Sequence, residues 1–204
     1  MENKKDLGQF YTTNYEYILQ KLFIPKNIKN IIEPFAGNGD LIPFIKQIEK
    51  ENKNNYNIEC FDIDPKKKYI IKRDSILHPP DYNNKFIITN PPYLARNKSS
   101  NKTLFNKYNV NDLYKCIIKE ILVNKCLGGI LIIPLNFWSS IRKLDIELRK
   151  SFLNIYDIVL LNIFEEKVFD DTSYTICSFQ FELKKKDKNI LNIIIYPSKK
   201  KIKT

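Results

Sequence analysis

Apolar strands that alternate with helical segments are the feature that most constrains this fold. Residues 130–134, with the sequence Ile-Leu-Ile-Ile-Pro, predict a strand that is buried on both faces, and residues 30–33, 57–61 and 86–89 predict further short strands. Near-continuous apolar strands are typical of a parallel sheet that helices cover on both sides. We therefore predict an α/β fold with a largely parallel sheet.

Helical periodicity fills the intervals between these strands. Apolar residues recur at helical spacing in residues 41–51 and 110–127, and the second helix is predicted to end at Gly128 and Gly129. A charged amphipathic helix is predicted for residues 139–152. Two more strands are predicted for residues 156–163 and 174–183.

One connection in this pattern is unusually short. Only eleven residues, 63–73, separate Asp62 from Asp74, and these are too few for a crossover helix and a full strand between parallel neighbours. Either an extended segment replaces the helix, or residues 69–71 form a short strand after a tight return.

Composition narrows the setting of the protein. No stretch is apolar for long enough to span a bilayer, and the start of the chain lacks the apolar segment of a signal peptide, so we expect a soluble, cytoplasmic protein without a membrane partner. The cysteines are widely spaced and include no Cys-x-x-Cys pair, which favours buried free thiols and no metal site. They are Cys60, Cys116, Cys126 and Cys177.

The net charge of +11 and the pI of about 9.3 suit a polyanionic partner such as nucleic acid. The chain is also rich in Lys, Asn and Ile, a bias typical of an AT-rich genome, which raises the lysine content without selection for binding. Charge alone therefore does not identify the partner.

Polar side chains stand at the ends of three predicted strands. Glu33, Asp62 and Asn90 each fall at or just after a strand end. Ligands of parallel sheets bind beyond the carboxyl ends of the strands. We therefore predict a binding site at this edge.

The segment 33–40, Glu-Pro-Phe-Ala-Gly-Asn-Gly-Asp, lies between a predicted strand and a predicted helix, where glycines let a ligand approach the backbone. It lacks the third glycine of the dinucleotide fingerprint, which disfavours a pyrophosphate ligand. Asp62 stands at about the distance at which an acid on the next strand reaches ribose hydroxyls; alternatively, Asp62 and Asp64 open a turn before Pro65. A nucleoside with a carboxylate, such as S-adenosylmethionine, fits this pattern best.

The segment Asn90-Pro91-Pro92-Tyr93 follows the predicted strand 86–89 directly. Two prolines in succession donate no backbone hydrogen bonds and hold the chain extended, so the strand must stop there. The segment presents an amide side chain, a carbonyl that no local N–H is expected to bond, and an aromatic ring.

In their order along the chain, these motifs resemble the N6-adenine DNA methyltransferases whose motif order begins with a Gly-Gln-Phe-Tyr-Thr-Pro-like segment. Here that segment is Gly8–Thr13, with Thr13 where proline is usual. The resemblance covers nearly the whole chain and includes Glu33–Gly39, Asp62, Asp74, Asn90–Tyr93, Asp112–Tyr114, Gly128–Gly129, Pro134 with Trp138, and Val168–Phe169.

This resemblance implies a Rossmann-like methyltransferase fold with a mostly parallel seven-stranded sheet and helices on both faces. It implies a catalytic domain over residues 1–183, followed by a basic tail or an extra edge strand over residues 184–204, with no separate target-recognition domain evident. The implied cofactor is S-adenosylmethionine. Its implied binding residues are Phe10, Tyr11, Thr12, Glu33, Pro34, Phe35, Ala36, Gly37, Gly39, Asp62, Ile63, Asp74, Ser75 and Asn90.

The implied catalytic residues are Asn90, Pro91, Pro92 and Tyr93. The resemblance implies that the Asn90 side-chain oxygen and the Pro91 carbonyl accept hydrogen bonds from the target N6, which stabilises the positive charge that develops there. Because the amine is unreachable in a duplex, the adenine is expected to flip out and stack on Tyr93 and Phe169.

The roles of the other substrate residues stay open. Tyr174 competes with Phe169 for the second stacking position, and ordinary core packing is an equal reading of Phe169. Arg96 is a candidate phosphate contact, as is Lys98, although a solvated loop explains both.

Three alternative functions also stay open. The same tetrad suits a glutamine amide, as in methyltransferases that act on release factors, although these usually carry a helical domain before the cofactor loop. An RNA adenine methyltransferase would use the same flipping and stacking. A non-enzymatic or partner-dependent subunit is the third reading, because family members usually carry a recognition domain. The expected partners are duplex DNA and a specificity subunit or recognition domain on another chain, in a restriction-modification setting.

Overall fold

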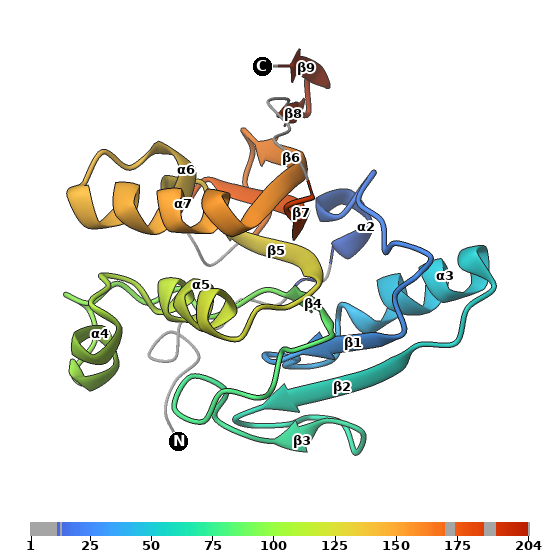
Figure 1. The fold of residues 1–204 in the computed structure, drawn as a ribbon, viewed down its shortest axis with the longest axis horizontal. Helices are drawn as coiled ribbons and strands as arrows, with labels where there is room; N and C mark the ends of the chain where they lie inside the picture. The colour runs from blue at the N-terminus through green and yellow to red at the C-terminus, as the bar shows by residue number, and fades with distance from the viewer. Residues whose placement is uncertain (1–11, 13, 170–173, 186–190, 204) are drawn as a thin grey trace.

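The computed structural model describes residues 12, 14–169, 174–185 and 191–203. Its strands form one sheet in the order β3-β2-β1-β4-β5-β7-β6-β8-β9 (Figure 1). The strands are β1 (Asn30–Glu33), β2 (Asn57–Asp62), β3 (Ile71–Lys72), β4 (Phe86–Thr89), β5 (Gly128–Pro134), β6 (Tyr156–Phe164), β7 (Ile176–Leu183), β8 (Asn192–Tyr196) and β9 (Lys200–Lys203). The helices are α2 (Tyr15–Ile18), α3 (Ile42–Asn52), α4 (Thr103–Tyr108), α5 (Leu113–Val123), α6 (Asn136–Ser139) and α7 (Lys143–Ile155).

The sheet has a parallel and a mixed half. Strands β3, β2, β1, β4 and β5 pair in parallel, whereas β7 lies antiparallel between β5 and β6. Strand β8 pairs parallel with β6, and β9 returns antiparallel to β8. The predicted α/β class is confirmed, but the predicted seven-stranded sheet is wrong. The isoleucine-rich run of β8 pairs with the outer edge of β6, and β9 then pairs with β8, which makes nine strands.

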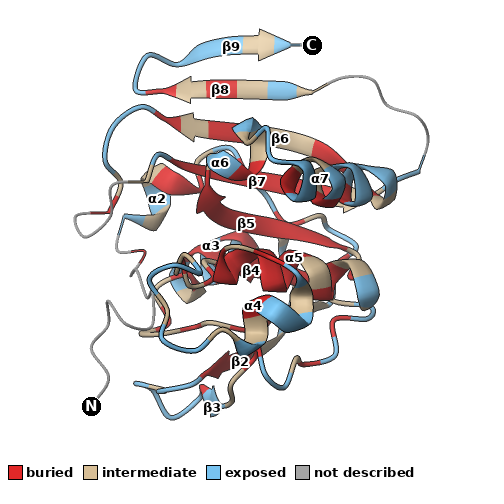
Figure 2. Cartoon of the chain, turned by 90° about the vertical axis from the view of Figure 1, so that its left-hand side faces the viewer, coloured by how far each residue is buried: buried red, intermediate tan, exposed pale blue. Residues whose placement is uncertain are grey.

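Helices cover both faces of the sheet. Figure 1 shows α3 on one side of the sheet and α5 and α7 on the other. The central strands between them are buried along their whole length, which Figure 2 shows in red for β4 and β5. This burial explains why the sequence of both strands has no polar face.

Gly128 and Gly129 begin β5 and do not end a helix, so the predicted helix end is wrong. A Cβ atom at Gly129 would collide with the side chain and the backbone oxygen of Ile87 on β4. One at Gly128 would meet the backbone of Phe181 on β7, and Gly128 has a φ of +152°. The two glycines therefore allow β5 to pack between its neighbours.

The two longer helices of the second half differ from their predicted ranges. Of the predicted helix 110–127, only Leu113–Val123 is helical, as α5, because Asn109 ends α4 in a left-handed conformation and Asp112 is extended, with φ −150°. The predicted helix 139–152 corresponds to α7, which begins at Lys143, whereas Ser139 is the last residue of α6. Ser140 and Arg142 are extended and separate the two helices.

The short connection after β2 contains a strand and no helix. Residues 63–70 return the chain directly to β3, which pairs in parallel with the end of β2 at Phe61 and Asp62. Of the two predicted alternatives, the short strand after a tight return is correct. Asp74 consequently lies at the same edge of the sheet as Asp62.

Two predictions from composition are also tested by the structure. All four cysteines are buried and free. Among the described residues, no helix is long and apolar enough to cross a membrane.

Candidate active site

A pocket opens at the carboxyl edge of the parallel half of the sheet. Its empty volume is about 1120 Å³, including the open mouth, which is ample for a nucleoside cofactor. The pocket is lined by Thr12, Glu33, Phe35, Ala36, Gly37, Asp40, Leu41, Asp62, Ile63, Arg73, Asp74, Ser75, Ile76, Asn90, Pro92, Leu94, Ser99, Asn101, Leu104, Phe105 and Leu113. The three predicted strand-end residues Glu33, Asp62 and Asn90 thus meet in one cavity.

Asp62 connects the end of β2 with the glycine loop. Its Oδ2 accepts a hydrogen bond of 2.8 Å from the backbone N–H of Gly37, and its Oδ1 accepts one of 2.8 Å from the N–H of Asp64. The second hydrogen bond forms the local turn before Pro65 that the sequence analysis gave as the alternative role of Asp62. Since the buried Asp62 also lines the pocket, it bonds within the turn and borders the space for a ligand at once.

Glu33 places a carboxyl group at the base of the pocket. The residue is 1% exposed, and Oε2 has no hydrogen-bond partner among the described residues. Burial, followed by the nearby Asp40 and Asp62 carboxylates, raises the pKa of Glu33 from 4.5 to about 8. An unpaired buried carboxyl of this kind is costly, and a cation in the pocket would stabilise its ionised form.

Asp40 and Thr12 bring the N-terminal segment to the same pocket. Burial raises the pKa of Asp40, while a hydrogen bond from the backbone N–H of Thr12 and the charge of Lys67 act in the opposite direction. The Thr12 hydroxyl in turn accepts a hydrogen bond of 3.1 Å from Asn90 Nδ2. Thr12 therefore joins the glycine loop side of the pocket to the segment Asn90–Tyr93.

The Asn90 amide is held at both ends. Nδ2 donates to Thr12, and Oδ1 accepts a hydrogen bond from the Tyr93 hydroxyl. An amide oxygen has two lone pairs and can accept two hydrogen bonds. These contacts fix the amide plane at the wall of the pocket.

Tyr93 lies behind the pocket wall. Its side chain is 3% exposed, and its hydroxyl also lies 2.7 Å from the carbonyl oxygen of Ile132 on β5. Its ring meets the rings of Tyr114 and Tyr174 edge to face, at 6.2 and 6.3 Å between centroids. In this arrangement Tyr93 supports Asn90 and does not line the cavity.

The remaining predicted cofactor residues are distributed unevenly. Phe35, Ala36, Ile63, Asp74 and Ser75 line the pocket, whereas Pro34 and Gly39 do not. Oδ1 of Asp74 accepts hydrogen bonds from the N–H groups of the two residues that follow Ser75, at 3.0 and 2.9 Å. Phe10 and Tyr11 lie outside the described residues.

Gly39 has a structural reason of its own to be glycine. Its φ is +79°, and a Cβ atom would collide with the hydroxyl of Tyr69, which lies over the loop. Tyr69 comes from the short connection 63–70, so this connection covers the glycine loop.

The predicted substrate residues do not line the pocket. Pro91 is buried beside Asn90, and Pro92 is the only one of the two prolines among the lining residues. Arg96 is exposed and donates to Asn106 on α4 at 2.6 Å. Phe169 is buried in the core, and Tyr174 is half-buried with a hydrogen bond to Asp112.

Sequence reasoning missed the wall that residues 94–113 form. Leu94, Ser99, Asn101, Leu104 and Phe105 contribute to it, on the excursion that carries α4. Hydrogen bonds of Lys102 to the backbone oxygens of residues 96 and 99 hold this excursion together. No sequence motif marks these residues. Asp40, which also lines the pocket, could have been predicted from its place at the end of the glycine loop.

The chain is similar to curated methyltransferases along its full length. It is 30% identical to the type II methyltransferase M.HincII of Haemophilus influenzae over 232 aligned residues, which cover 100% of this chain and 42% of that protein. The chain thus spans less than half the length of the curated relative. No protein-family model matches the chain.

Solved structures agree on the fold. A modification subunit assigned to a type I restriction enzyme of Vibrio vulnificus superposes with a TM-score of 0.68 at 13% identity, over 93% of this chain and 47% of that chain. A protein of Listeria monocytogenes assigned to the class I S-adenosylmethionine-dependent methyltransferases superposes with a TM-score of 0.64 at 14% identity, over 88% of this chain and 61% of that chain. The relatives and the fold imply S-adenosylmethionine as the cofactor.

Proposed function

We propose that this chain transfers a methyl group from S-adenosylmethionine to the exocyclic N6 of adenine in DNA. The observation that carries the proposal is one pocket in which the Asp62–Gly37 contact and the Asn90 amide lie together. The similarity to type II methyltransferases supports the reaction class.

The lining residues suit the cofactor on chemical grounds. Asp62 offers a carboxylate for ribose hydroxyls, and the Glu33 carboxyl, unpartnered among the described residues, offers a negative group for a cation. Leu104 and Phe105 give the pocket an apolar wall for a purine ring. When bound, S-adenosylmethionine supplies an activated methyl group on a sulfonium.

Asn90 is proposed to act on the acceptor amine. The lone pair of an amino group on a purine is delocalised into the ring, so the nitrogen is a poor nucleophile. Asn90 Oδ1 and the Pro91 carbonyl would accept hydrogen bonds from this nitrogen and stabilise the positive charge that develops on it. The contacts of Asn90 with Thr12 and Tyr93 fix the amide before substrate binds, which lowers the cost of ordering.

DNA is proposed as the substrate because the relatives are a type II methyltransferase and a modification subunit of a restriction enzyme. The adenine would be flipped out of the duplex to reach Asn90. Tyr93, Phe169 and Arg96 remain the proposed substrate residues. To stack on the base, Tyr93 would have to turn out of its buried position and release the hydrogen bond with which it orients Asn90 before the substrate binds.

A specificity subunit or a recognition domain on another chain is proposed as a partner. The solved structures of similar fold include a modification subunit of a type I restriction enzyme, which supports a partner of this kind. If the partner supplies sequence recognition, the purified chain should bind S-adenosylmethionine and methylate DNA weakly and with low sequence selectivity.

The test is incubation of the chain with labelled S-adenosylmethionine and, separately, duplex DNA, single-stranded DNA, RNA and a release factor. Mass analysis of the product should find N6-methyladenine in DNA. Methylglutamine in the release factor, or methyladenine confined to RNA, would contradict the proposal and identify the alternative. Cofactor binding without product on any substrate would favour a non-enzymatic subunit.

A further inference from the structure

Four consecutive exposed residues span the turn from α6 to α7 and the start of α7. They read Ile141-Arg142-Lys143-Leu144, of which Lys143 and Leu144 are the first residues of α7, and Ile141 is 89% exposed. A single exposed apolar residue is common on protein surfaces and needs no explanation by itself. The surroundings of Ile141 do call for an explanation, because two basic residues follow it directly and hydrogen bonds hold the turn on which it lies.

The turn is held by buried polar groups from two helices. Arg149 of α7 donates to the carbonyl oxygens of Phe137, at 2.8 Å, and of Ser140, at 3.3 Å. The Ser140 hydroxyl donates to Asp145 at 2.7 Å. The backbone just before Ile141 is therefore bonded to the helix that follows it.

A buried ion pair anchors this support to α5. Lys115 lies 2.6 Å from Asp145, and both side chains are almost wholly buried. Burial opposes ionisation of Asp145, yet hydrogen bonds from Lys115 and Ser140 and the charges of Lys115 and Arg142 lower its pKa overall. Because buried ion pairs are costly to form, one that braces a surface turn indicates that the position of the turn matters.

The helix α6, which precedes the turn, is linked to the segment Asn90–Tyr93 through Tyr114. It follows the carboxyl end of β5, which pairs with β4, the strand that leads to Asn90. The Tyr114 hydroxyl donates to Asn136 of α6 at 2.6 Å, and the Tyr114 ring contacts Tyr93 edge to face. Figure 1 shows the connection from α6 to α7 on the same side of the molecule as α4 and the arrowheads of β2 and β3.

Val123 provides a natural contrast. It is 76% exposed, but it stands at the last residue of α5, which leads back to the start of β5. The amino ends of the parallel strands lie there, on the edge of the sheet away from the pocket. The two side chains are thus similarly exposed. Of the two, only Ile141 is followed directly by two basic residues and lies on the edge of the sheet that carries the pocket.

We propose that Ile141 enters a DNA duplex beside the target adenine as an apolar wedge, while Arg142 and Lys143 contact the adjacent phosphates. Apolar side chains that insert between base steps partially unstack them, and basic residues beside them hold the backbone. The wedge would lower the cost of base flipping. This inference rests on the proposed function, because it requires duplex DNA as the substrate.

The test compares duplex DNA with the same DNA heat-denatured to single strands, with labelled S-adenosylmethionine and the full chain. Ile141→Ser is expected to lower methyl incorporation into the duplex by about tenfold, because unstacking costs a few kcal/mol. Incorporation into denatured DNA should change by less than about twofold, since single strands need no unstacking. Ile141→Leu should retain duplex activity, and the matched control Val123→Ser should leave both rates unchanged.

Cofactor affinity is measured for each variant by calorimetry and should equal that of the unaltered chain, which shows that the pocket is intact. Equal losses of Ile141→Ser on both forms of DNA, or no loss on either, would overturn the wedge while leaving the proposed function in place. A complete absence of incorporation by the unaltered chain into both forms would overturn the proposed function, and the wedge with it.

Discussion

The parallel and mixed halves of the sheet use their buried polar side chains differently. In the parallel half, Glu33, Asp62 and Asn90 face one pocket. In the mixed half, Asn162 of β6 and Ser178 of β7, which are antiparallel neighbours, bond to backbone carbonyl oxygens of residues 20 and 18, at 2.9 and 2.5 Å. Parallel strands end together at one edge, so their terminal residues converge, whereas antiparallel neighbours end at opposite edges. Strand direction thus separates the polar groups available for chemistry from those that hold the fold together.

The largest expected effect is that of Asn90→Ala. Removing the acceptor from the reacting nitrogen should lower the rate of methyl transfer by about 10²- to 10³-fold. Affinity for S-adenosylmethionine should change much less, because Asn90 forms only one part of the wall. Single-turnover kinetics and calorimetry measure the two quantities, and unaffected turnover would refute the role of Asn90.

Asp62→Asn should act on cofactor binding. The substitution removes the charge that bonds the Gly37 N–H, and hydrogen bonds to charged groups contribute about 1.5–3 kcal/mol. The dissociation constant for S-adenosylmethionine should rise by about 10- to 100-fold. Asp64→Asn is the matched control, since Asp64 is mostly exposed and does not line the pocket. Equal affinity of Asp62→Asn and the unaltered chain would remove Asp62 from the cofactor site.

Asn162→Ala tests the opposite half of the comparison. Its amide is buried and bonds to the Gln20 carbonyl oxygen, so its loss should lower the free energy of unfolding by about 1–3 kcal/mol. Turnover per folded molecule should be unchanged, because Asn162 does not line the pocket. Denaturant titration measures the free energy of unfolding, and the methylation assay measures turnover. A loss of turnover as large as that of Asn90→Ala would show that the polar groups of the two halves do not have separate roles.

Within a single pH unit, the smallest effect is a pH dependence of stability due to Glu33. The folded-state pKa of about 8 exceeds the usual 4.5, so the contribution of this group to stability is complete below about 4.5 and is lost as the pH rises to about 8. The free energy of unfolding should fall by at most about 1.4 kcal/mol per pH unit in that window. Glu33→Gln should remove this slope, as urea titrations at several pH values would show. A slope that survives the substitution would belong to other groups.

The parallel core was predictable because its central strands β4 and β5 are almost wholly apolar. Residues 30–33 and 86–89 match β1 and β4 as observed, and Glu33, Asp62 and Asn90 follow from the rule that parallel strands end together. The direct return from β2 to β3 was one of two predicted alternatives. The eleven residues between Asp62 and Asp74 exclude a crossover helix with a full strand, but they allow either an extended segment or a short strand.

What the sequence could not supply depends on contacts between distant segments. Gly128 and Gly129 appear as a helix stop until β7 and Ile87 are known to crowd them. The pocket wall around Leu104 and Phe105 comes from an excursion whose packing no local pattern encodes. Burial of Tyr93 likewise depends on Tyr114 and Tyr174, which lie far along the chain.

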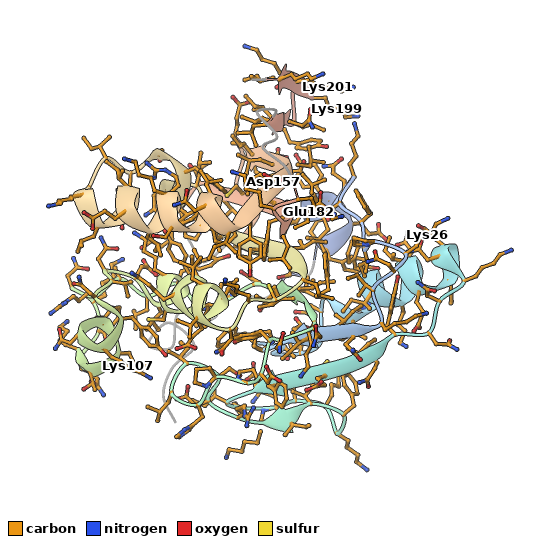
Figure 3. The ribbon with its side chains drawn as sticks, in the orientation of Figure 1. Lys26, Lys107, Asp157, Glu182, Lys199 and Lys201 are labelled. Atoms are coloured by element: carbon orange, nitrogen blue, oxygen red, sulfur yellow. The ribbon has the colours of Figure 1, made fainter. Side chains whose placement is uncertain are left out.

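The outer strand β9 leaves one margin of the sheet lined with cations. It reads Lys-Lys-Ile-Lys, and Figure 3 shows Lys199 and Lys201 at this end of the molecule. A second molecule that added its own β9 alongside would bring ammonium groups of the same sign together. The repulsion discourages fibrous growth from this margin, a protection that concentrated salt would weaken.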